Sequence, residues 1–557
     1  MTDTLKWWQK TVVYQIYPRS FKDSTGNGIG DLKGVIDKLD YLKDLGVETV
    51  WFSPFFESPQ RDHGYDITNF RAINPEYGTM QDFEALLKEM HDRDMKMVVD
   101  FVLNHSSIDH PWFKESALSK DNTKREWYIW RDGKKSGGEK PPNNWKAMTG
   151  GRAWIYFENT DQWVYFHFLP SMIDLNYRNP EVKNEMFNTM RFWLDKGVDG
   201  FRLDILHAIY EDELLRDDKF CFQLGPSDKN TAALFHQHKY DLNLPETYDF
   251  SMELRRVMDE YRNPERFLVG EVFGSIEDVR KYYGPNNNGL HTTFLFEFIT
   301  AAISFKPQKI AKVISRIENS LPSPYTPTYV YGNHDRPRYV SFLKNDVQKA
   351  KLLATMQLTL RGVPFIYYGE EIGMPNVKIK LKESQDPIGQ KYAKFPISQI
   401  TSLFGISLTR DGCRTPMQWT PEQNAGFSTN KNVKPWLKIS DTYKKINVEV
   451  EEVNPNSLLN CYKKLLKIRN KFDSLQKGEL EFLNLGKLNE KCLAFRRIHE
   501  AQELNIFLNF SKDSFNLQWS KQDPKLLFST IPNKNMLEYD SQRNSFKLDG
   551  YEGLILE

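Results

Sequence analysis

The stretch Lys96-Met97-Val98-Val99-Asp100-Phe101 is a mainly apolar run of strand length, and it follows an amphipathic helical segment at residues 82–95. Upstream, Thr49-Val50-Trp51-Phe52 precedes that helix, and Val12-Val13-Tyr14-Gln15-Ile16-Tyr17 precedes a helical segment at 32–45. Apolar runs that alternate with amphipathic helices are typical of parallel strands joined by crossover helices. The first hundred residues therefore predict three successive β/α units.

The same alternation resumes after residue 174. Further strand-length runs lie at residues 198–203, 266–272, 292–298, 328–332 and 364–368. A helix is expected to begin at Asn179-Pro180, an N-cap followed by proline in the first turn, and to end before Gly197. Eight strands with intervening helices predict an α/β fold, a (β/α)8 TIM barrel.

Two stretches interrupt this alternation, and a different pattern follows it. Residues 104–173 are rich in Trp, Gly, Asn and Pro, which predicts an inserted B subdomain of short strands, because structureless loops of that length are uncommon. Residues 373–453 indicate a loop-rich insertion, and alternating runs after residue 475 predict a C-terminal antiparallel β-domain. The predicted domains are the barrel at 1–103 and 174–474, the B subdomain at 104–173 and the C-terminal domain at 475–557.

Composition and charge exclude several classes of partner. The 557 residues include 75 Lys and Arg against 74 Asp and Glu, so the formal net charge of +1 favours neither nucleic acid nor membrane binding. No apolar run approaches the roughly 18 residues of a membrane span, and the N-terminal residues lack a secretory signal pattern. The four cysteines lie far apart, which favours reduced thiols in a cytoplasmic protein over disulfides or a zinc site.

Acidic residues gather at the predicted carboxyl ends of the strands, where barrel enzymes hold their catalytic residues. Asp100 ends the third strand, Asp204 the fourth and Glu271 the fifth, and Asp335 follows the seventh. One such acid is more often a helix cap or an ion-pair partner, but several together cost stability by mutual repulsion. Glycoside cleavage needs a carboxylate at the anomeric carbon and a protonated acid at the leaving oxygen. The pattern therefore predicts a glycosidase.

Arg202 stands two residues before Asp204, so both side chains point to the same side of the strand. An arginine in that place would keep the carboxylate ionised, while burial near another acid would raise the pKa of a proton donor. The sequence therefore predicts both an ionised carboxylate and a proton donor with a raised pKa at this end of the barrel.

Four motifs at these strand ends resemble those of the α-amylase superfamily of glycoside hydrolases, family 13. They are Asp100-Phe101-Val102-Leu103-Asn104-His105, Gly200-Phe201-Arg202-Leu203-Asp204, Gly270-Glu271-Val272 and Gly332-Asn333-His334-Asp335, and Asp174-Leu175-Asn176 resembles a fifth. The resemblance covers nearly the whole chain. It implies a retaining mechanism with Asp204 as nucleophile, Glu271 as general acid/base and Asp335 as transition-state stabiliser.

Three flanking stretches, at residues 8–19, 62–66 and 414–419, are similar to the oligo-1,6-glucosidase/α-glucosidase branch of that family. The similarity implies an exo-acting enzyme in which Asp62 and Arg414 pair and hold the non-reducing glucose of a small α-glucoside. It also implies further residues of the substrate site, namely Tyr65, His105, Phe168, Arg202 and His334. The protein is expected to be a monomer or a homodimer.

Ile205, directly after the predicted nucleophile, is expected to face the leaving sugar. In the branch a valine at this position accompanies α-1,6 activity, whereas alanine or threonine accompanies α-1,4 activity, so the resemblance favours isomaltose-type substrates. A maltase, a trehalose-6-phosphate hydrolase and a sucrose isomerase remain open alternatives. A non-catalytic relative, like the heavy chains of amino-acid transporters, is disfavoured because every catalytic acid is present.

Residues 23–31 resemble the first part of an EF-hand-like loop, with oxygen-bearing side chains at alternate positions around glycines. The resemblance implies a structural Ca²⁺ ion held by side-chain oxygens and one carbonyl, from Asp23, Thr25, Asn27, Ile29 and Asp31. Relatives usually have Asp-x-Asn-x-Asp here, so the lower charge of this loop predicts weaker binding. The alternative is a glycine-rich turn without metal, and no organic cofactor is expected.

Overall fold

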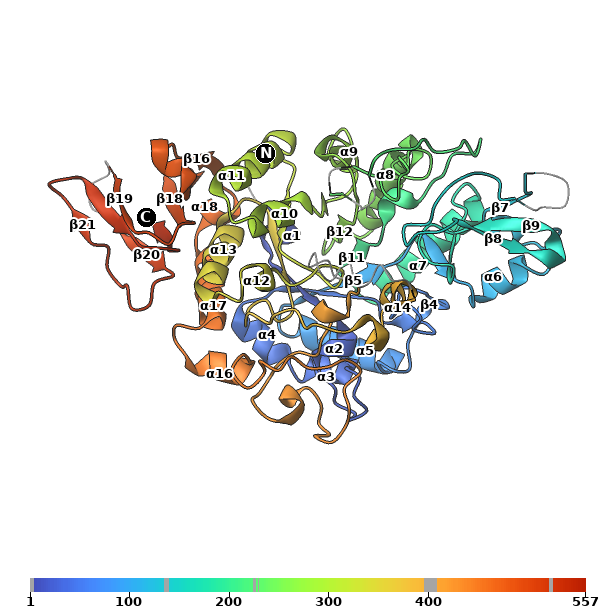
Figure 1. Cartoon of the computed structure of the whole chain (residues 1–557), viewed down its shortest axis with the longest axis horizontal. Coiled ribbons are helices and arrows are strands. Elements are labelled where there is room, and N and C mark those ends of the chain that lie inside the picture. The colour runs from blue at the N-terminus through green and yellow to red at the C-terminus, as the bar shows by residue number, and fades with distance from the viewer. Residues whose placement is uncertain (1–4, 135–139, 224–226, 229, 395–407, 520–523) are drawn as a thin grey trace.

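A parallel sheet of eight strands, rolled into a barrel, forms the centre of the molecule in the computed structural model (Figure 1). The structure describes residues 5–134, 140–223, 227–228, 230–394, 408–519 and 524–557. The barrel strands are β1 (Val13–Ile16), β2 (Thr49–Phe52), β5 (Lys96–Phe101), β11 (Gly200–Leu203), β12 (Phe267–Gly270), β13 (Thr292–Thr293), β14 (Thr328–Val330) and β15 (Val363–Tyr367). Their spatial order, β13-β12-β11-β5-β2-β1-β15-β14, follows the chain around the barrel, which confirms the predicted fold.

Threonine hydroxyls join the two ends of this strand order. Thr292 Oγ1 donates to the carbonyl of Thr326 at 2.8 Å, and Thr328 Oγ1 donates to the carbonyl of Thr293 at 2.7 Å. These bonds connect β13 to β14 and to Thr326, just before β14. Side-chain hydrogen bonds therefore join the first and last strands of the sheet order.

Each barrel strand is buried on both faces, as expected of parallel sheets covered by helices. Val13, Trp51, Val98 and Phe365 belong to one core cluster, whereas their strand neighbours belong to a second, larger cluster. Because successive side chains of a strand point to opposite faces, the first cluster fills the barrel and the second lies under the helices.

Two of the helices around the barrel match predictions, those expected at residues 82–95 and from Asn179-Pro180 to before Gly197, and two other predictions need correction. The barrel is covered by these and further helices. The main ones are α5 (Met80–His91), α7 (Pro180–Asp195), α8 (Pro245–Asp259), α11 (Pro307–Ser320), α13 (Val347–Thr359) and α17 (Leu458–Lys471). The predicted helix at 32–45 is two helices, α3 (Leu32–Ile36) and α4 (Leu39–Leu45), and Gly46 ends the second with a φ of 97°. The predicted strand at 292–298 ends at Thr293, and α10 (Glu297–Ile303) follows it, because a short apolar run suits either structure.

The segment between β5 and β11 contains its own sheet and lies at one end of the elongated molecule (Figure 1). Its strands are β6 (His105–Ser107), β7 (Trp130–Arg131), β8 (Trp154–Phe157), β9 (Gln162–Tyr165) and β10 (Met172–Asp174). The antiparallel pair β6–β10 brings His105 opposite Asp174. The inserted segment therefore leaves and re-enters the barrel at one point, beside the end of β5.

The C-terminal segment lies at the opposite end of the molecule and forms two antiparallel sheets (Figure 1). The larger has the order β16 (Glu479–Phe482), β17 (Cys492–His499), β18 (Gln502–Asn509), β23 (Gly553–Leu556) and β20 (Leu526–Ser529). The smaller contains β19 (Phe515–Gln518), β22 (Ser545–Leu548) and β21 (Tyr539–Asp540). The predicted C-terminal β-fold is confirmed.

The predicted insertion at 373–453 contains two short α-helices among its described residues, α14 (Pro387–Ala393) and α16 (Val448–Val453), while residues 395–407 lie outside the described part of the chain.

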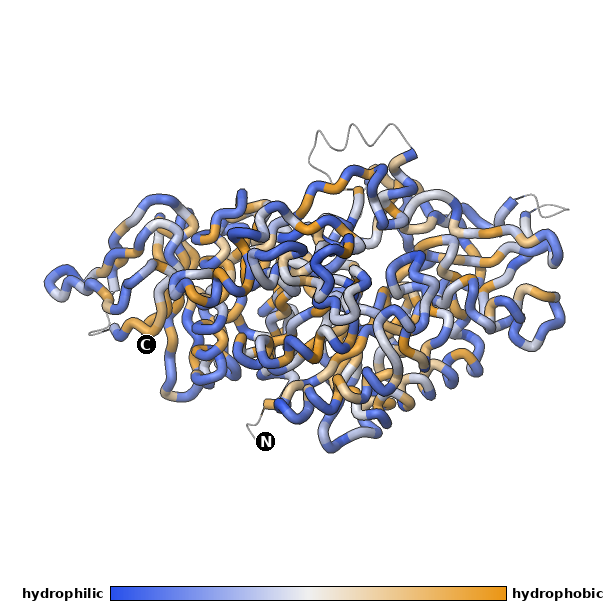
Figure 2. Tube along the Cα trace, turned by 90° about the horizontal axis from the view of Figure 1, so that it is seen from below, coloured by the Kyte–Doolittle hydropathy of each residue, from blue (hydrophilic) through white to orange (hydrophobic). Residues whose placement is uncertain are grey.

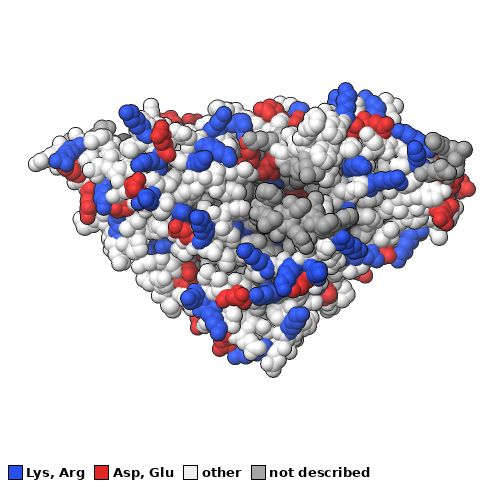
Figure 3. Space-filling model, in the orientation of Figure 1, with Lys and Arg blue, Asp and Glu red and all other residues white. Residues whose placement is uncertain are grey.

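Hydrophobic and hydrophilic residues alternate along much of the trace (Figure 2), and acidic and basic side chains are interspersed over the face in Figure 3. Among the described residues, no helix has both the length and the apolar character needed to cross a membrane.

Candidate active site

The carboxyl ends of the barrel strands and the inserted segment together line a cavity of about 390 Å³. Eight residues that the sequence predicts for the site lie on its wall: Asp62, Tyr65, His105, Phe168, Asp204, Ile205, Glu271 and Asp335. The predicted Arg202, His334 and Arg414 contact these residues from behind the wall. The predicted residues of the substrate site therefore come together in one place.

Arg202 is the centre of the acidic group. Its Nη1 donates to Asp204 at 2.7 Å and to Asp100 at 2.8 Å, and its Nη2 donates to Glu271 at 2.5 Å. The guanidinium is fully buried, so these charge-assisted hydrogen bonds form where water does not weaken them. One cation thereby holds three carboxylates, contributed by three adjacent strands, in fixed positions.

Burial dominates the electrostatics of two of these acids. It raises the pKa of Glu271 to about 7, against the opposing charge of Arg202, and the carboxylates of Asp204 and Asp335 add to the increase. Burial likewise raises the pKa of Asp204 to about 7, and Arg202 opposes this shift. The pKa values of both carboxyl groups therefore lie near neutral pH, where general acids and bases are most effective.

The pKa of Asp335 moves in the opposite direction. Burial tends to raise it, but His334, Arg410 and Arg414 outweigh burial and lower the pKa well below its ordinary range. Arg414 Nη2 donates to Asp335 Oδ1 at 2.8 Å, and the side chain of Asn333 accepts the backbone N–H of Asp335 at 2.9 Å. Asp335 is therefore an ionised carboxylate in a fixed orientation.

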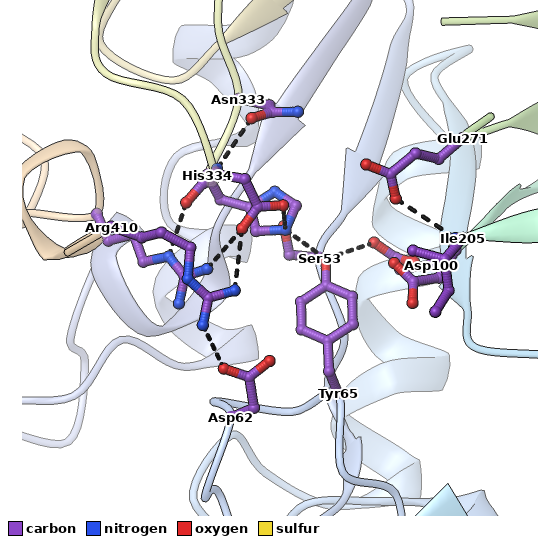
Figure 4. Close-up of polar contacts among 12 residues, drawn as sticks. Ser53, Asp62, Tyr65, Asp100, Ile205, Glu271, Asn333, His334 and Arg410 are labelled. Atoms are coloured by element: carbon purple, nitrogen blue, oxygen red, sulfur yellow. Dashed lines mark hydrogen bonds and ion pairs between the residues drawn. The ribbon is translucent and has the colours of Figure 1, made fainter. Parts of the chain in front are cut away.

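Tyr65 on the cavity wall stacks on His334 behind it, near the acids (Figure 4). Their ring centroids lie 5.4 Å apart at an interplanar angle of 8°. The hydroxyl of Tyr65 contacts His334 Nε2 at 2.5 Å and donates to Asp100 at 3.1 Å, while Gln15 contacts His334 Nδ1 at 2.8 Å. Through Gln15, Tyr65, Asp100 and His334, these hydrogen bonds connect four parts of the barrel: β1, the loop that follows β2, β5 and the turn after β14.

The predicted pairing of Asp62 with Arg414 is wrong in the structure, because Asp62 pairs with Arg410 instead (Figure 4). Arg410 Nη2 lies 2.5 Å from Asp62 Oδ1 and 2.8 Å from Asp386 Oδ1, and its Nη1 lies 3.2 Å from Asp335 Oδ1. Arg414 turns to Asp335 and to the carbonyl of His334. The two arginines are four residues apart and flank one short 3-10 helix, Asp411–Cys413, and the fold decides which one reaches Asp62.

Arg410 and Asp386 were not predicted from the sequence. Asp386 is fully buried, and Arg410 lowers its pKa to about 2 despite burial. Arg410 carried a weak signal, since it precedes the matching stretch at 414–419 by four residues, but Asp386 lies in a segment without a recognised motif. Other unpredicted wall residues are Met148, Thr149, His167, Met172, His207, Asp228, Phe273, Arg336, Ile388 and Tyr392.

Ile205 adopts a backbone conformation that is unusual for its residue type. Its φ of 33° and ψ of 44° lie in the left-handed region, which a β-branched residue enters only under strain of about 1–3 kcal/mol. Its backbone N–H contacts Glu271 Oε2 at 3.4 Å, and its side chain lies on the cavity wall. The turn after β11 thus directs this side chain into the site at an energetic cost.

The oxygens of the predicted calcium loop already accept hydrogen bonds from the protein. Asp23 accepts four, from Gly28, Gly26, Thr25 and Ser428. Asp31 accepts from the Ser24 N–H and hydroxyl, from Thr25 and, as the N-cap of α3, from Gly34, and the side-chain oxygen of Asn27 accepts the N–H of Ile29. Hydrogen bonds from the protein therefore already use the oxygens of both carboxylates, and the loop in this conformation does not fit Ca²⁺. The loop also takes no part in the cavity wall.

Comparisons with known proteins show the family of the chain. The family model described as the catalytic domain of alpha amylase matches residues 15–478. An oligo-1,6-glucosidase of Heyndrickxia coagulans is 38% identical over 94% of this chain and 95% of that protein, and a trehalose-6-phosphate hydrolase of Bacillus subtilis is 35% identical over 91% and 90%. The crystal structure of the alpha-glucosyl transfer enzyme XgtA matches with a TM-score of 0.88 and 32% identity over 99% of both chains. The chain therefore belongs to the α-amylase family of glycoside hydrolases.

Proposed function

We propose that the protein is an exo-acting, retaining α-glucosidase that releases glucose from the non-reducing end of short α-1,6-linked glucosides. The observation that carries this proposal is the ion-pair group of Asp62, Arg410 and Asp335 on the wall of a small cavity. Charged groups in such a place can bind the hydroxyls of one terminal glucose, and a cavity of about 390 Å³ favours a short substrate.

In the proposed reaction Asp204 attacks the anomeric carbon while the protonated Glu271 gives its proton to the glycosidic oxygen, so the C–O bond breaks and a glucosyl ester forms. Glu271, now a carboxylate, removes a proton from water, which attacks the same carbon. The ester bond to Asp204 breaks, which releases glucose and restores the Asp204 carboxylate. Asp335 remains ionised and stabilises the positive charge at the sugar ring. The raised pKa of Glu271 and the lowered pKa of Asp335 support these different roles.

The preference for an α-1,6 linkage rests on Ile205 and on the relatives. Several relatives are oligo-1,6-glucosidases at 36–38% identity. The strained backbone of Ile205 presents a bulky β-branched side chain to the cavity. Such a stiff side chain narrows the site for the leaving sugar and favours a linkage with an additional exocyclic carbon.

A trehalose-6-phosphate hydrolase is the main alternative, since a protein of that name is also a relative. A phosphate group calls for cations that are free to bind it. Among the described residues of the cavity wall, the cationic ones are Arg336 and Arg410. Arg336 pairs with Asp228 at 2.5 Å, and Arg410 pairs with three carboxylates. This arrangement favours a neutral sugar.

The deciding experiment compares kcat/KM for isomaltose, maltose, sucrose and trehalose 6-phosphate with one enzyme preparation, while NMR follows the anomer that is released. The proposal expects the highest value for isomaltose and initial release of α-glucose. A higher value for maltose or trehalose 6-phosphate, or initial release of β-glucose, would contradict it.

We also propose that the protein works in the cytoplasm as a monomer or homodimer. All four cysteines are unpaired thiols, which suits a reducing compartment. Fractionation of the native cells and sedimentation of the purified protein test the two parts of this proposal.

A further inference from the structure

A second group of titratable side chains lies outside the acidic centre, in the long segment between β11 and α8. Asp218, His238 and Asp241 each offer a potential ligand atom, and these atoms all lie within 4.8 Å of one another. The exposed fractions of the three residues are 5%, 0% and 0%. Within the described part of the chain, this is the one cluster of His, Cys, Asp and Glu with such spacing.

The internal contacts of this cluster leave several polar atoms without a partner. His238 Nδ1 lies 2.9 Å from Asp241 Oδ2, and Asp218 Oδ1 accepts the backbone N–H of Lys239 at 3.0 Å. Asp218 Oδ2, His238 Nε2 and Asp241 Oδ1 are buried and have no hydrogen-bond partner among the described residues. Buried polar atoms without partners cost stability. A bound ion that interacts with these atoms would remove this cost.

A fourth side chain approaches the cluster from the inserted segment. His167 follows β9, and its Nδ1 lies 3.9 Å from Asp241 Oδ2, while its Nε2 is buried without a partner among the described residues. The set therefore comprises two imidazoles and two carboxylates, contributed by two separate segments of the chain.

We propose that Asp218, His238 and Asp241 bind one divalent transition-metal ion, best matched by Zn²⁺, with His167 as the fourth ligand. Imidazole nitrogen favours Zn²⁺ over Ca²⁺ or Mg²⁺, and buried structural zinc sites use four protein ligands. Ligands at about 2.0–2.2 Å from zinc lie about 3.4 Å from one another in a tetrahedron. The potential ligand atoms of Asp218, His238 and Asp241 lie within 4.8 Å of one another, so ion binding would require these side chains to rearrange. The ion would also neutralise two buried carboxylates.

The position of the cluster gives the ion a structural role at the wall of the catalytic cavity. Asn144 of the inserted segment exchanges two hydrogen bonds with the backbone of Asp218, at 2.8 and 2.9 Å, and the indole of Trp145 donates to the carbonyl of Arg216 at 3.0 Å. His167 is both a proposed ligand and a residue of the cavity wall. A bound ion would therefore hold the inserted segment against the β11–α8 segment and stabilise the part of the cavity wall that contains His167.

The test measures metal binding directly, and no step of it depends on the proposed substrate. The full-length protein is stripped with a chelator and titrated with Zn²⁺ by calorimetry, its melting temperature is recorded with and without Zn²⁺, and Co²⁺ is bound as a spectroscopic probe. We expect one ion per chain, a higher melting temperature with Zn²⁺, and the visible absorption of tetrahedral Co²⁺. The Co²⁺ spectrum needs no variant and so remains informative if the variants fold poorly.

Variants locate the ion. Asp241→Asn and His238→Gln should each weaken Zn²⁺ binding by more than about 100-fold. Loss of a residue that only hydrogen-bonds to a metal ligand costs at most about 100-fold in affinity, so a larger loss identifies a ligand. Asp217→Asn is the matched control, since Asp217 is the exposed neighbour of Asp218 and pairs with Lys134 at 3.2 Å. Equal loss in the control would overturn the site. Absence of stoichiometric Zn²⁺ in the wild-type protein, with a melting temperature that responds to pH alone, would show that the cluster holds a proton instead.

Discussion

The carboxylate of Asp62 and the guanidinium of Arg410 meet at 2.5 Å, although 348 positions separate the two residues in the sequence. Arg410 also contacts Asp386 and Asp335. Both members of the pair are largely buried, so removal of either leaves a charge without its partner in a poorly hydrated place. This relationship makes Arg410 the residue on which the arrangement of the terminal-glucose site depends.

Asp62→Ala and Arg410→Ala should each reduce kcat/KM on a disaccharide by about 10²–10⁴-fold, since truncation of one member of a buried ion pair costs roughly 3–5 kcal/mol. In the double variant the losses should be far from additive, with a coupling energy above about 1 kcal/mol. Steady-state kinetics of the four proteins measure it. The matched cycle of Asp62 with Arg414 should show a smaller coupling, and additive losses for Asp62 and Arg410 would disprove their functional pairing.

Asp204→Asn should lower kcat by about 10⁴-fold or more, and Glu271→Gln by about 10²–10⁴-fold, because one loses the nucleophile and the other the proton donor. Both proteins should remain folded, as judged by circular dichroism. The fluoride of α-glucose needs no protonation of its leaving group, so it should restore formation of the glucosyl enzyme in Glu271→Gln but not in Asp204→Asn. Equal behaviour of the two variants toward the fluoride would contradict the assigned roles.

The pH dependence of the first step should show a descending limb near pH 7. Burial raises the pKa of Glu271 to about 7, so the protonated form that donates is present below this pH and is lost as the pH rises through it. Profiles of kcat/KM for isomaltose should fall above about pH 7, whereas the profile for α-glucosyl fluoride should lack this limb. A shared descending limb would assign it to a group other than the proton donor.

Ile205 should determine linkage preference. One methylene in an apolar contact provides about 1–3 kcal/mol of discrimination, so Ile205→Val should keep the preference for isomaltose over maltose and Ile205→Ala should flatten or reverse it. The ratio of the two kcat/KM values measures the effect. If Ile205→Ala changes both values by the same factor, Ile205 contributes to packing and not to specificity.

Added Ca²⁺ should leave the melting temperature unchanged, because the carboxylates of Asp23 and Asp31 already accept hydrogen bonds from the loop. An ion at 100 times its Kd would add about 2.7 kcal/mol to the free energy of unfolding, which calorimetry detects easily. A rise in melting temperature with Ca²⁺ that Asp31→Asn abolishes would instead establish the calcium loop.

Local sequence patterns predicted the barrel because each strand and helix carries its own periodicity. The runs at 49–52 and 96–101 match β2 and β5 at both ends. The acids could be assigned to one mouth for the same reason, since the carboxyl ends of parallel strands meet at one end of a barrel. The errors fell where periodicity is ambiguous, as in the apolar run at 292–298, of which only Thr292–Thr293 is strand.

Contacts between distant loops could be decided only by the tertiary structure. The sequence placed Arg414 at the site but not Arg410, and the path of the chain before the two arginines determines which one reaches Asp62. The cluster of Asp218, His238 and Asp241 likewise has no periodic signal, because its geometry depends on a left-handed φ of 49° at His238 and on a segment folded against the insertion. Side-chain periodicity reports which face of an element is buried, whereas the meeting of two irregular segments depends on the packing of everything between them.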